Sequence, residues 1–441
     1  MIYIYSPSEN DSRLRYIAKH IFNNILGSDF AITRDRSFFM KQTALCINYS
    51  EENLNNGLQI FPEGLLSEKG LRETVAINET QWHGEFCFFC QLTGDIPFDI
   101  FAASFYLLTL YEEYIPKRLD SHGRFHHEES LVYRNDVLEI PLIDRWACLL
   151  KDEWEKRGYD VSSFQLRKYR VISTFDIDHP YLYRNKGLVK NAGGALRDLL
   201  QGKWKQTLHR IAVLFHIKQD PYFQAICRID RLQKQFGRTY YLFILIAGRS
   251  RYDRKTIYPQ RKFYHYLKQL QSVNIGLHPS YGTLCDSSRL MKEKQKLERI
   301  LNRKITLSRQ HFLRMQIPVT FRDLNLAGIE EDFTLSFASV PGFRSGTAVP
   351  HFFYDIECEE ETGLLIRPTV MMDSTLIIHQ GLSPDEALQK MKSLADACKK
   401  SGGDYLTLWH NSNLSETEYG ENTWIDVFIK SYKYALSLEQ E

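Results

Sequence analysis

The sequence predicts an α/β protein in which a smaller α/β (α+β) N-terminal domain, residues 1–160, precedes a distorted (β/α)7 barrel, residues 161–441. With 441 residues, the chain is too long for one ordinary domain. From residue 169 onward, apolar β-rich runs alternate with helical patterns, which is typical of a parallel sheet. The charge balance also changes near residue 160, because residues 1–160 carry 16 basic and 25 acidic side chains and the remainder carries 40 and 29.

The N-terminal domain is expected to mix short strands and helices. Strands are predicted over Ile2–Tyr5 and Thr43–Asn48, and helices over Phe98–Tyr114 and Arg145–Arg157. Cys87 and Cys90 form a lone CxxC, and the phenylalanines around them favour a buried strand over a zinc knuckle. The histidines at 122, 126 and 127 lie in or beside a turn, where solvated side chains are commoner than metal ligands.

The barrel strands are predicted from seven apolar runs: Tyr169–Asp178, Thr239–Ile246, Asn274–Ser280, Ser308–Leu313, Asp332–Ala338, Leu365–Asp373 and Asp404–Asn411. Helices are expected over Glu293–Leu301, Thr320–Ala327, Ser383–Lys400 and Asn422–Leu438. A basic helical insertion, about 184–235, separates the first two strands and is longer than a strand-to-helix connection needs.

The carboxyl ends of the predicted strands carry polar residues, as active sites of such barrels do. Asp176 and Asp178 are spaced i, i+2, so both carboxylates face the same side of a strand. Two carboxylates this close repel unless a cation or a shared proton relieves them. The pair therefore suggests a metal ligand beside a proton acceptor, and the alternative is a strand-end cap or an ion pair with an arginine.

Three further strand ends carry histidines. His278 and His311 could complete a zinc-like site with one carboxylate, or each could be a hydrogen-bonded core histidine. His410 alternates with inward apolar residues and could donate a proton to a leaving group, the alternative being a structural histidine. Arg344 lies between glycines, where it could orient a carboxylate base or meet an oxyanion, or be an ordinary surface arginine.

These residues, in this order, resemble the motifs of the polysaccharide deacetylase superfamily (carbohydrate esterase family 4, NodB homology). The similarity is greatest to a two-domain bacterial branch with an extra N-terminal domain. Four segments resemble the family motifs: Ser173–Asp178, Leu277–Ser280, Gly342–Gly346 and Leu406–His410. The usual second motif has another histidine at the position of Gly282, and His311 is proposed as its replacement.

The resemblance implies a role for each matched residue. Asp176 would be the catalytic base and Arg344 the residue that aligns it, while His410 would protonate the leaving group. Asp178 and His278, with His311, would bind a divalent metal, zinc foremost, with cobalt, nickel and manganese as further candidates. The implied reaction is metal-dependent removal of an acetyl group from a sugar or glycan, chiefly N-deacetylation, in surface polysaccharide or lipopolysaccharide biosynthesis.

Two other function classes were weighed. A glycoside hydrolase would also suit a barrel, but it needs two carboxylates flanking a sugar bond, whereas histidines crowd these strand ends. A catalytically degenerate sugar-binding or scaffold protein that retains the deacetylase fold is the main alternative, because Gly282 leaves the usual motif incomplete.

Charge and hydropathy limit the partners. A formal net charge of +2 argues against nucleic acid, and no signal sequence or membrane span is evident, so a cytoplasmic protein is expected. Within the insertion, residues 184–218 hold eight Lys or Arg and one acid, Asp198, with apolar residues at helical spacing. These could be amphipathic helices packed on the barrel with a solvated basic face. They could instead contact an anionic inner membrane or a lipid-carrier-linked glycan. The oligomeric state is open.

Overall fold

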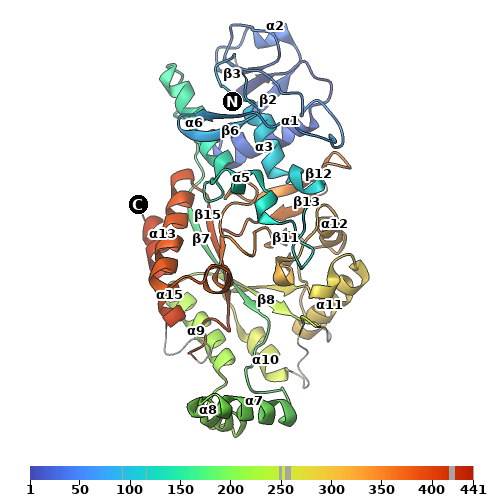
Figure 1. The fold of residues 1–441 in the computed structure, drawn as a ribbon. Helices are drawn as coiled ribbons and strands as arrows, with labels where there is room; N and C mark the ends of the chain where they lie inside the picture. Colours follow the sequence, from blue (N-terminus) through green and yellow to red (C-terminus); the bar gives the residue numbers. More distant parts are fainter. Residues whose placement is uncertain (92, 116, 248–250, 254–259, 417–422, 441) are drawn as a thin grey trace.

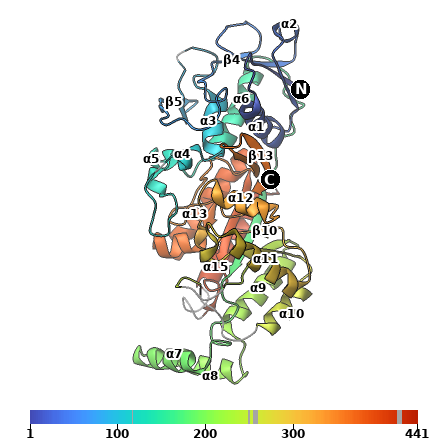
Figure 2. The same cartoon turned by 90° about the vertical axis from the view of Figure 1, so that its right-hand side faces the viewer.

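The computed structural model describes the chain except residues 92, 116, 248–250, 254–259, 417–422 and 441. It is an elongated α/β molecule with a small sheet at one end and a large sheet in the middle (Figure 1). A pair of helices, α7 (Leu188–Leu200) and α8 (Trp204–Leu214), projects from the opposite end (Figure 2). None of the described helices is long and apolar enough to cross a bilayer.

The small sheet has four parallel strands in the order β2-β1-β3-β4. Its strands are β1 (Ile2–Tyr5), β2 (Phe30–Thr33), β3 (Leu45–Tyr49) and β4 (Leu58–Ile60). The helices of this part are α1 (Ser12–Ala18) with the π-helix Lys19–Ile25, α2 (Arg36–Phe39), α3 (Ile100–Leu108), α4 (Tyr111–Tyr114), α5 (Leu131–Arg134) and α6 (Leu142–Lys156). An antiparallel hairpin of β5 (Glu79–Trp82) and β6 (Glu85–Phe88) places Cys87 in a buried strand, as predicted.

The single helix predicted over Phe98–Tyr114 is wrong, because the structure has two helices there. Asp99 caps α3 by accepting hydrogen bonds from the backbone of Phe101 and Ala102. Leu110 then has φ 57°, a left-handed conformation that cannot continue a right-handed helix. The chain therefore turns before α4 begins.

The large sheet has the order β12-β13-β11-β10-β9-β8-β7-β15-β14, and only the β12–β13 pair is antiparallel. Its strands are β7 (Arg170–Ile177), β8 (Tyr240–Leu245), β9 (Val273–His278), β10 (Leu307–Ser308), β11 (Glu331–Asp332), β12 (His351–Asp355), β13 (Glu360–Ile366), β14 (Met371–Met372) and β15 (Asp404–His410). The predicted parallel sheet with alternating helices is confirmed.

Three predicted strands differ from the structure. The fourth and fifth runs form only the two-residue strands β10 and β11. The sixth run divides into β13 and β14, which lie toward opposite ends of the sheet order. Between them, the Thr369 and Val370 N–H groups donate to the carbonyls of Leu335 and Leu406 on either side. These bonds do not complete a strand ladder between the described ends of the sheet, so a closed barrel is not shown.

The helices around the large sheet are α9 (Pro221–Gln235), α10 (Arg261–Gln269), α11 (Ser287–Leu301), α12 (Val319–Leu326), α13 (Pro384–Ser401) and α15 (Thr423–Leu438). α9 packs into the main core through Ala225, Ile226 and Ile229, so it belongs with the sheet. α13 begins at a capping box between Ser383 and Glu386, as its sequence predicts. Asn422, the predicted first residue of the last helix, lies outside the described residues.

Buried polar contacts join the two sheets. The Arg344 guanidinium donates to both Glu113 carboxylate oxygens, at 2.8 and 2.7 Å, and both side chains are buried. Asp144 of α6 accepts from the Thr347 hydroxyl and the Ala348 N–H. In addition, the N-terminal core includes four residues of the later chain: Phe337, Val349, Tyr354 and Ile356. The segment around residues 337–356 thus serves both halves of the molecule.

We predict that Arg344→Met lowers the free energy of unfolding by about 3–5 kcal/mol, because it leaves the Glu113 carboxylate buried without its partner. Urea denaturation measures this loss. The matched control is Lys304→Met, whose pair with Glu330 is exposed and whose loss should leave the free energy of unfolding close to that of the wild type. Equal effects of the two substitutions would show that the Glu113 pair does not join the cores.

Candidate metal centre

Asp178, His278 and His311 meet at the carboxyl edge of the large sheet. Asp178 follows β7, His278 ends β9, and His311 begins a short 3-10 turn after β10. One ligand atom from each lies within 4.8 Å of the other two. The Asp178 Oδ1 atom is 3.3 Å from His278 Nε2 and 3.9 Å from His311 Nε2. The structure thus brings together the three residues predicted as metal ligands.

Hydrogen bonds on the far side of each ring orient the two imidazoles. His278 Nδ1 lies 2.5 Å from the carbonyl oxygen of Arg309, and His311 Nδ1 lies 2.9 Å from Asp253 Oδ1. Carbonyl and carboxylate oxygens only accept hydrogen bonds, so each Nδ1 carries a proton and donates. In neutral imidazoles the Nε2 lone pairs then face Asp178, which is the usual arrangement of histidines that bind a metal.

The centre combines a partly buried carboxylate, that of Asp178, with the Nε2 lone pairs of two imidazoles. Asp178 Oδ1 is buried and accepts no hydrogen bond from the described residues. Burial would raise the pKa of Asp178, but the positive charges that His278, His311 and His410 carry when protonated outweigh it and hold that pKa well below its usual range. A divalent cation satisfies all three acceptors, and two imidazoles with one carboxylate suit zinc. Protonation of both imidazoles would be the alternative way to balance Asp178.

Asp176 lies beside this centre and is fixed by a buried ion pair. Arg309 Nη1 donates to Asp176 Oδ1 at 3.0 Å, and the other carboxylate oxygen is 3.6 Å from His278 Nε2. Arg309 also donates to the Phe333 carbonyl at 3.0 Å and to Thr369 Oγ1 at 3.3 Å. One oxygen of Asp176 is therefore anchored while the other faces the candidate metal ligands.

The sequence predicts that Arg344 contacts and aligns Asp176, but in the structure it does not. Its guanidinium pairs with Glu113 and donates to the Ser336 carbonyl, at the junction of the two cores. The contact expected of Arg344 is made by Arg309, which the sequence analysis did not select. A signal was present, because Arg309 and His311 have the same i, i+2 spacing after a strand as Asp176 and Asp178.

His410, at the end of β15, forms a dyad with Asp373. The Asp373 carboxylate lies 2.6 Å from His410 Nδ1 and accepts the His410 backbone N–H at 2.7 Å. Burial would lower the pKa of His410, but Asp373, with Asp178 and Asp176, raises it to about 10. The imidazole is therefore protonated at neutral pH, and because Nδ1 faces Asp373, its Nε2 proton is the one available for transfer.

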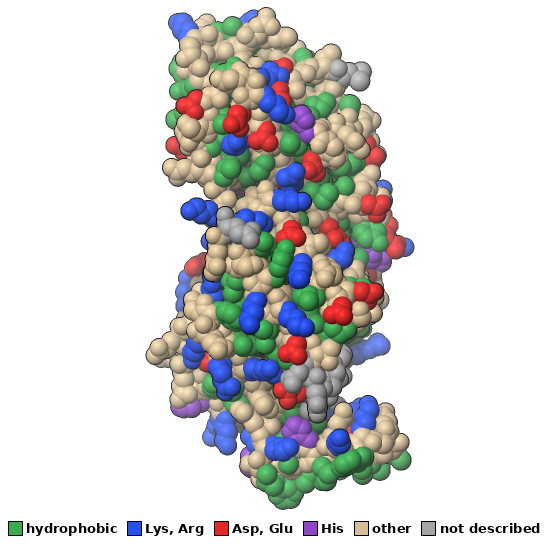
Figure 3. Space-filling view, turned by 90° about the vertical axis from the view of Figure 1, so that its left-hand side faces the viewer, with side chains coloured by type: hydrophobic (Ala, Val, Ile, Leu, Met, Phe, Trp, Pro, Cys, Tyr) green, Lys and Arg blue, Asp and Glu red, His purple; other side chains and the backbone are tan. Residues whose placement is uncertain are grey.

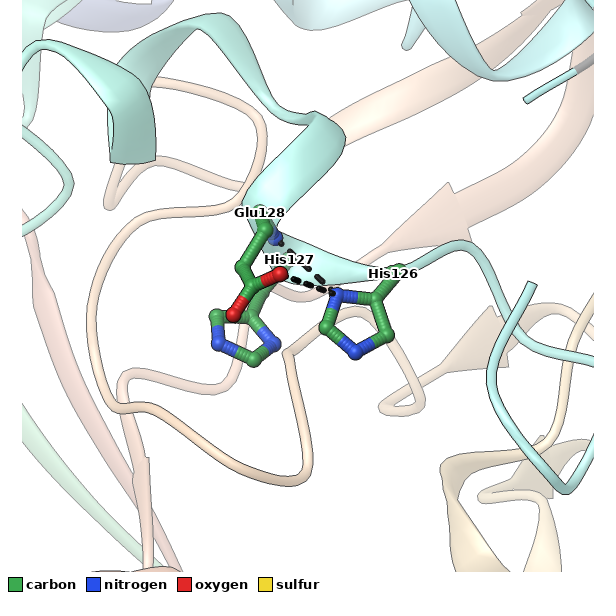
Figure 4. Close-up of side chains that lie close together, drawn as sticks. All are labelled: His126, His127 and Glu128. Carbon is green, nitrogen blue, oxygen red and sulfur yellow. Dashed lines mark hydrogen bonds and ion pairs between the residues drawn. The ribbon is translucent and has the colours of Figure 1, made fainter. Parts of the chain in front are cut away.

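Within the described part of the chain, a second cluster of possible ligands comprises His126, His127 and Glu128 (Figure 4). Its acceptors already have donors, because the Glu128 N–H donates to His126 Nδ1 at 3.3 Å and Arg118 pairs with Glu128. Arg118 Nη2 also lies 3.1 Å from His126 Nδ1. Since Arg118 already supplies the positive charge, this cluster needs no metal ion.

A protein-family model matches the N-terminal part of the chain. Residues 2–158 match the model of a family of unknown function, DUF7033. No curated protein matches the chain.

Three solved structures have weak overall similarity. A Mycobacterium smegmatis protein assigned as a polysaccharide deacetylase is 14% identical, with a TM-score of 0.41 over 62% of this chain and 84% of its own. A PuuE allantoinase is 10% identical, with a TM-score of 0.39 over 61% and 84%. A 4-alpha-glucanotransferase from Thermococcus litoralis is 10% identical, with a TM-score of 0.35 over 62% and 38%. At these values the functional conclusion rests on the site and not on the neighbours.

We predict that the purified protein contains a divalent metal that is lost in His311→Ala, because two ligands cannot retain it as three do. Metal content by inductively coupled plasma mass spectrometry is the measurement. The double substitution His126→Ala/His127→Ala is the matched control and should keep the wild-type metal content. If His311→Ala keeps its metal, or the control loses it, the centre has been misplaced.

Proposed function

We propose that the protein is a metal-dependent hydrolase that removes an acetyl group from a sugar or glycan, with the N-acetyl amide as its preferred bond. The observation that carries this proposal is the convergence of Asp178, His278 and His311, flanked by Asp176 on one strand and the His410 dyad on another. A metal site with an adjacent base and an adjacent protonated imidazole has the groups that amide hydrolysis requires.

Asp178, His278 and His311 would hold the divalent ion. Such an ion polarises an acetyl carbonyl and lowers the pKa of a water molecule, which makes water nucleophilic at neutral pH. The orienting contacts from the Arg309 carbonyl and Asp253 fix both imidazole rings before a metal binds, which reduces the entropy lost on coordination.

Asp176 would act as the general base. Its carboxylate oxygen beside His278 is in position to accept a proton from the attacking water, while Arg309 prevents the carboxylate from rotating away. Arg309 in turn packs against the adjoining rings of Phe243 and Phe333, whose centroids lie 4.6 and 5.8 Å from its guanidinium carbon. The base is thus held by a residue that is itself buried and packed.

His410 would act as the general acid. Its raised pKa keeps the imidazolium charged at neutral pH, so it can deliver a proton to the departing nitrogen. After transfer, Asp373 keeps the neutral ring oriented through Nδ1. Because an amine is a poor leaving group unless it is protonated, this dyad favours amide over ester hydrolysis.

The motif resemblance supports an acetylated sugar or glycan as the substrate and surface polysaccharide synthesis in the bacterial cytoplasm as the setting. The alternative, a degenerate sugar-binding or scaffold protein, was suggested by Gly282. The position of His311 beside Asp178 and His278 supports the enzyme, since it offers a third possible ligand atom within 4.8 Å of the other two.

We predict that Asp176→Asn lowers acetate release at least about a hundredfold, because asparagine cannot accept the proton from water. The measurement is acetate released from a panel of acetylated sugars and carrier-linked glycans. Metal content is the control and should stay at the wild-type level, since Asp176 is not one of the three ligands. Full turnover by the variant would refute the base assignment, whereas a metal-loaded wild type without acetate release would favour the scaffold alternative.

We predict that Asp373→Asn moves the alkaline limb of the pH profile of kcat/KM to lower pH. In the wild type, the Asp373 carboxylate raises the pKa of His410, so the acid stays protonated further into the alkaline range, and rate is lost as that proton dissociates. Removing the Asp373 charge lowers that pKa, so the loss begins earlier. An unchanged alkaline limb, with metal content equal to wild type, would mean that His410 is not the acid.

A further inference from the structure

The helices α7 and α8 pack on each other through polar side chains. Arg210 and Asp198 form an ion pair at 2.6 Å with both side chains at or below 9% exposure. Arg210 also lies 3.3 Å from Asn191 Oδ1 and 4.5 Å from the Tyr183 ring. Apart from Val213, the buried residues of the two helices are polar: Asn191, Asp198, Thr207 and Arg210. Amphipathic helices ordinarily bury their apolar faces against each other, whereas this pair buries mostly polar side chains.

The apolar side chains of the pair face solvent. Ten of the twenty large hydrophobic residues exposed in the described chain lie between residues 188 and 217. Leu188, Leu200 and Phe215 are 85%, 81% and 75% exposed. The others are Val189, Leu196, Leu199, Trp204, Leu208, Ile211 and Ile217. Figure 3 shows hydrophobic side chains, in green, gathered along the outer edge of the projecting pair. The expectation that these helices pack their apolar faces on the barrel is thus wrong.

Positive charge surrounds this apolar edge. Lys190, Arg197, Lys203, Lys205 and Lys218 are exposed, whereas Asp198, the one acid among residues 184–218, is buried against Arg210. Two copies of this surface would bring ten cations together, which opposes self-association. An anionic surface with an apolar interior complements both features, because it neutralises the cations and accepts the hydrophobic side chains.

We propose that the α7–α8 pair docks the protein on an anionic lipid bilayer. The apolar side chains enter the boundary between headgroups and acyl chains, and the five exposed cations lie among the anionic headgroups. The buried Arg210–Asp198 pair keeps the two helices in register while their apolar residues leave water. The pair begins ten residues after Asp178 in the chain. The segment that follows β7 therefore carries first a residue of the candidate metal centre and then the docking helices.

The experiment is flotation of the full chain with vesicles of phosphatidylcholine alone and of phosphatidylcholine with equal parts phosphatidylglycerol. We expect flotation with the anionic vesicles only, and less of it at high salt. The apolar variant Leu188→Ser/Leu200→Ser/Phe215→Ser and the charge variant Lys190→Glu/Arg197→Glu/Lys203→Glu/Lys205→Glu should each lower partitioning by more than about a hundredfold.

Matched controls use exposed residues elsewhere. Leu326→Ser, at a side chain 80% exposed on α12, and Lys292→Glu/Lys296→Glu on α11 should float as the wild type does. Sedimentation and circular dichroism establish that all variants remain folded. Equal flotation with neutral and anionic vesicles would overturn the proposal that anionic lipid is required. Wild-type flotation of the charge variant would overturn it as well. Absence of flotation, with self-association that the apolar variant abolishes, would show that a second copy covers this face. Each of these outcomes is independent of hydrolysis.

Discussion

Arg309 is the residue on which the candidate site depends, because it contacts both the proposed base, Asp176, and a proposed metal ligand, His278. Its guanidinium binds Asp176 and its backbone carbonyl accepts the His278 Nδ1 proton. A fully buried arginine is costly to desolvate, and this burial lowers the pKa of Arg309 despite the neighbouring Asp176. The cost is offset by hydrogen bonds to Asp176, the Phe333 carbonyl and Thr369. The arrangement is therefore stable only with all of these partners in place, which makes Arg309 a rigid reference point for the site.

Around Arg309, polar side chains are arranged in pairs in which one group orients the other. Asp253 holds His311, the Arg309 carbonyl holds His278, and Asp373 holds His410. In each pair the outer group binds Nδ1 and leaves Nε2 directed elsewhere. In the proposed mechanism, the two imidazoles whose Nε2 atoms face Asp178 are the metal ligands, and the imidazole of His410, whose pKa Asp373 raises, is the proton donor.

Much of the site could be predicted from the sequence, because parallel strands place their carboxyl ends at one edge. Asp176, Asp178, His278 and His410 follow from that rule once the strands are recognised. His311 was found by the same reasoning, although it lies in a turn after a two-residue strand. Although Gly282 offers no imidazole, His311, which follows β10, brings its Nε2 atom to 3.9 Å from Asp178 Oδ1.

What the sequence could not supply were contacts that depend on tertiary structure. Arg344 lies in a motif-like segment, but the crossing of residues 337–356 between the two cores directs it to Glu113. Asp253 lies in the connection after β8, where no periodic pattern indicates that its carboxylate reaches His311. The exposure of the apolar faces of α7 and α8 could not be predicted either, since helical spacing indicates that a helix has an apolar face but not whether that face is buried or exposed.

The central claim is that Asp178, His278 and His311 hold a divalent metal. An anomalous difference map from crystals of the purified wild-type protein, with data collected on either side of the absorption edge of the metal found, tests it directly. We expect one peak at about 2.0–2.2 Å from Asp178 Oδ1 and from both Nε2 atoms. Absence of a peak at this position in metal-supplemented crystals, or a peak only at His126 and His127, would contradict it.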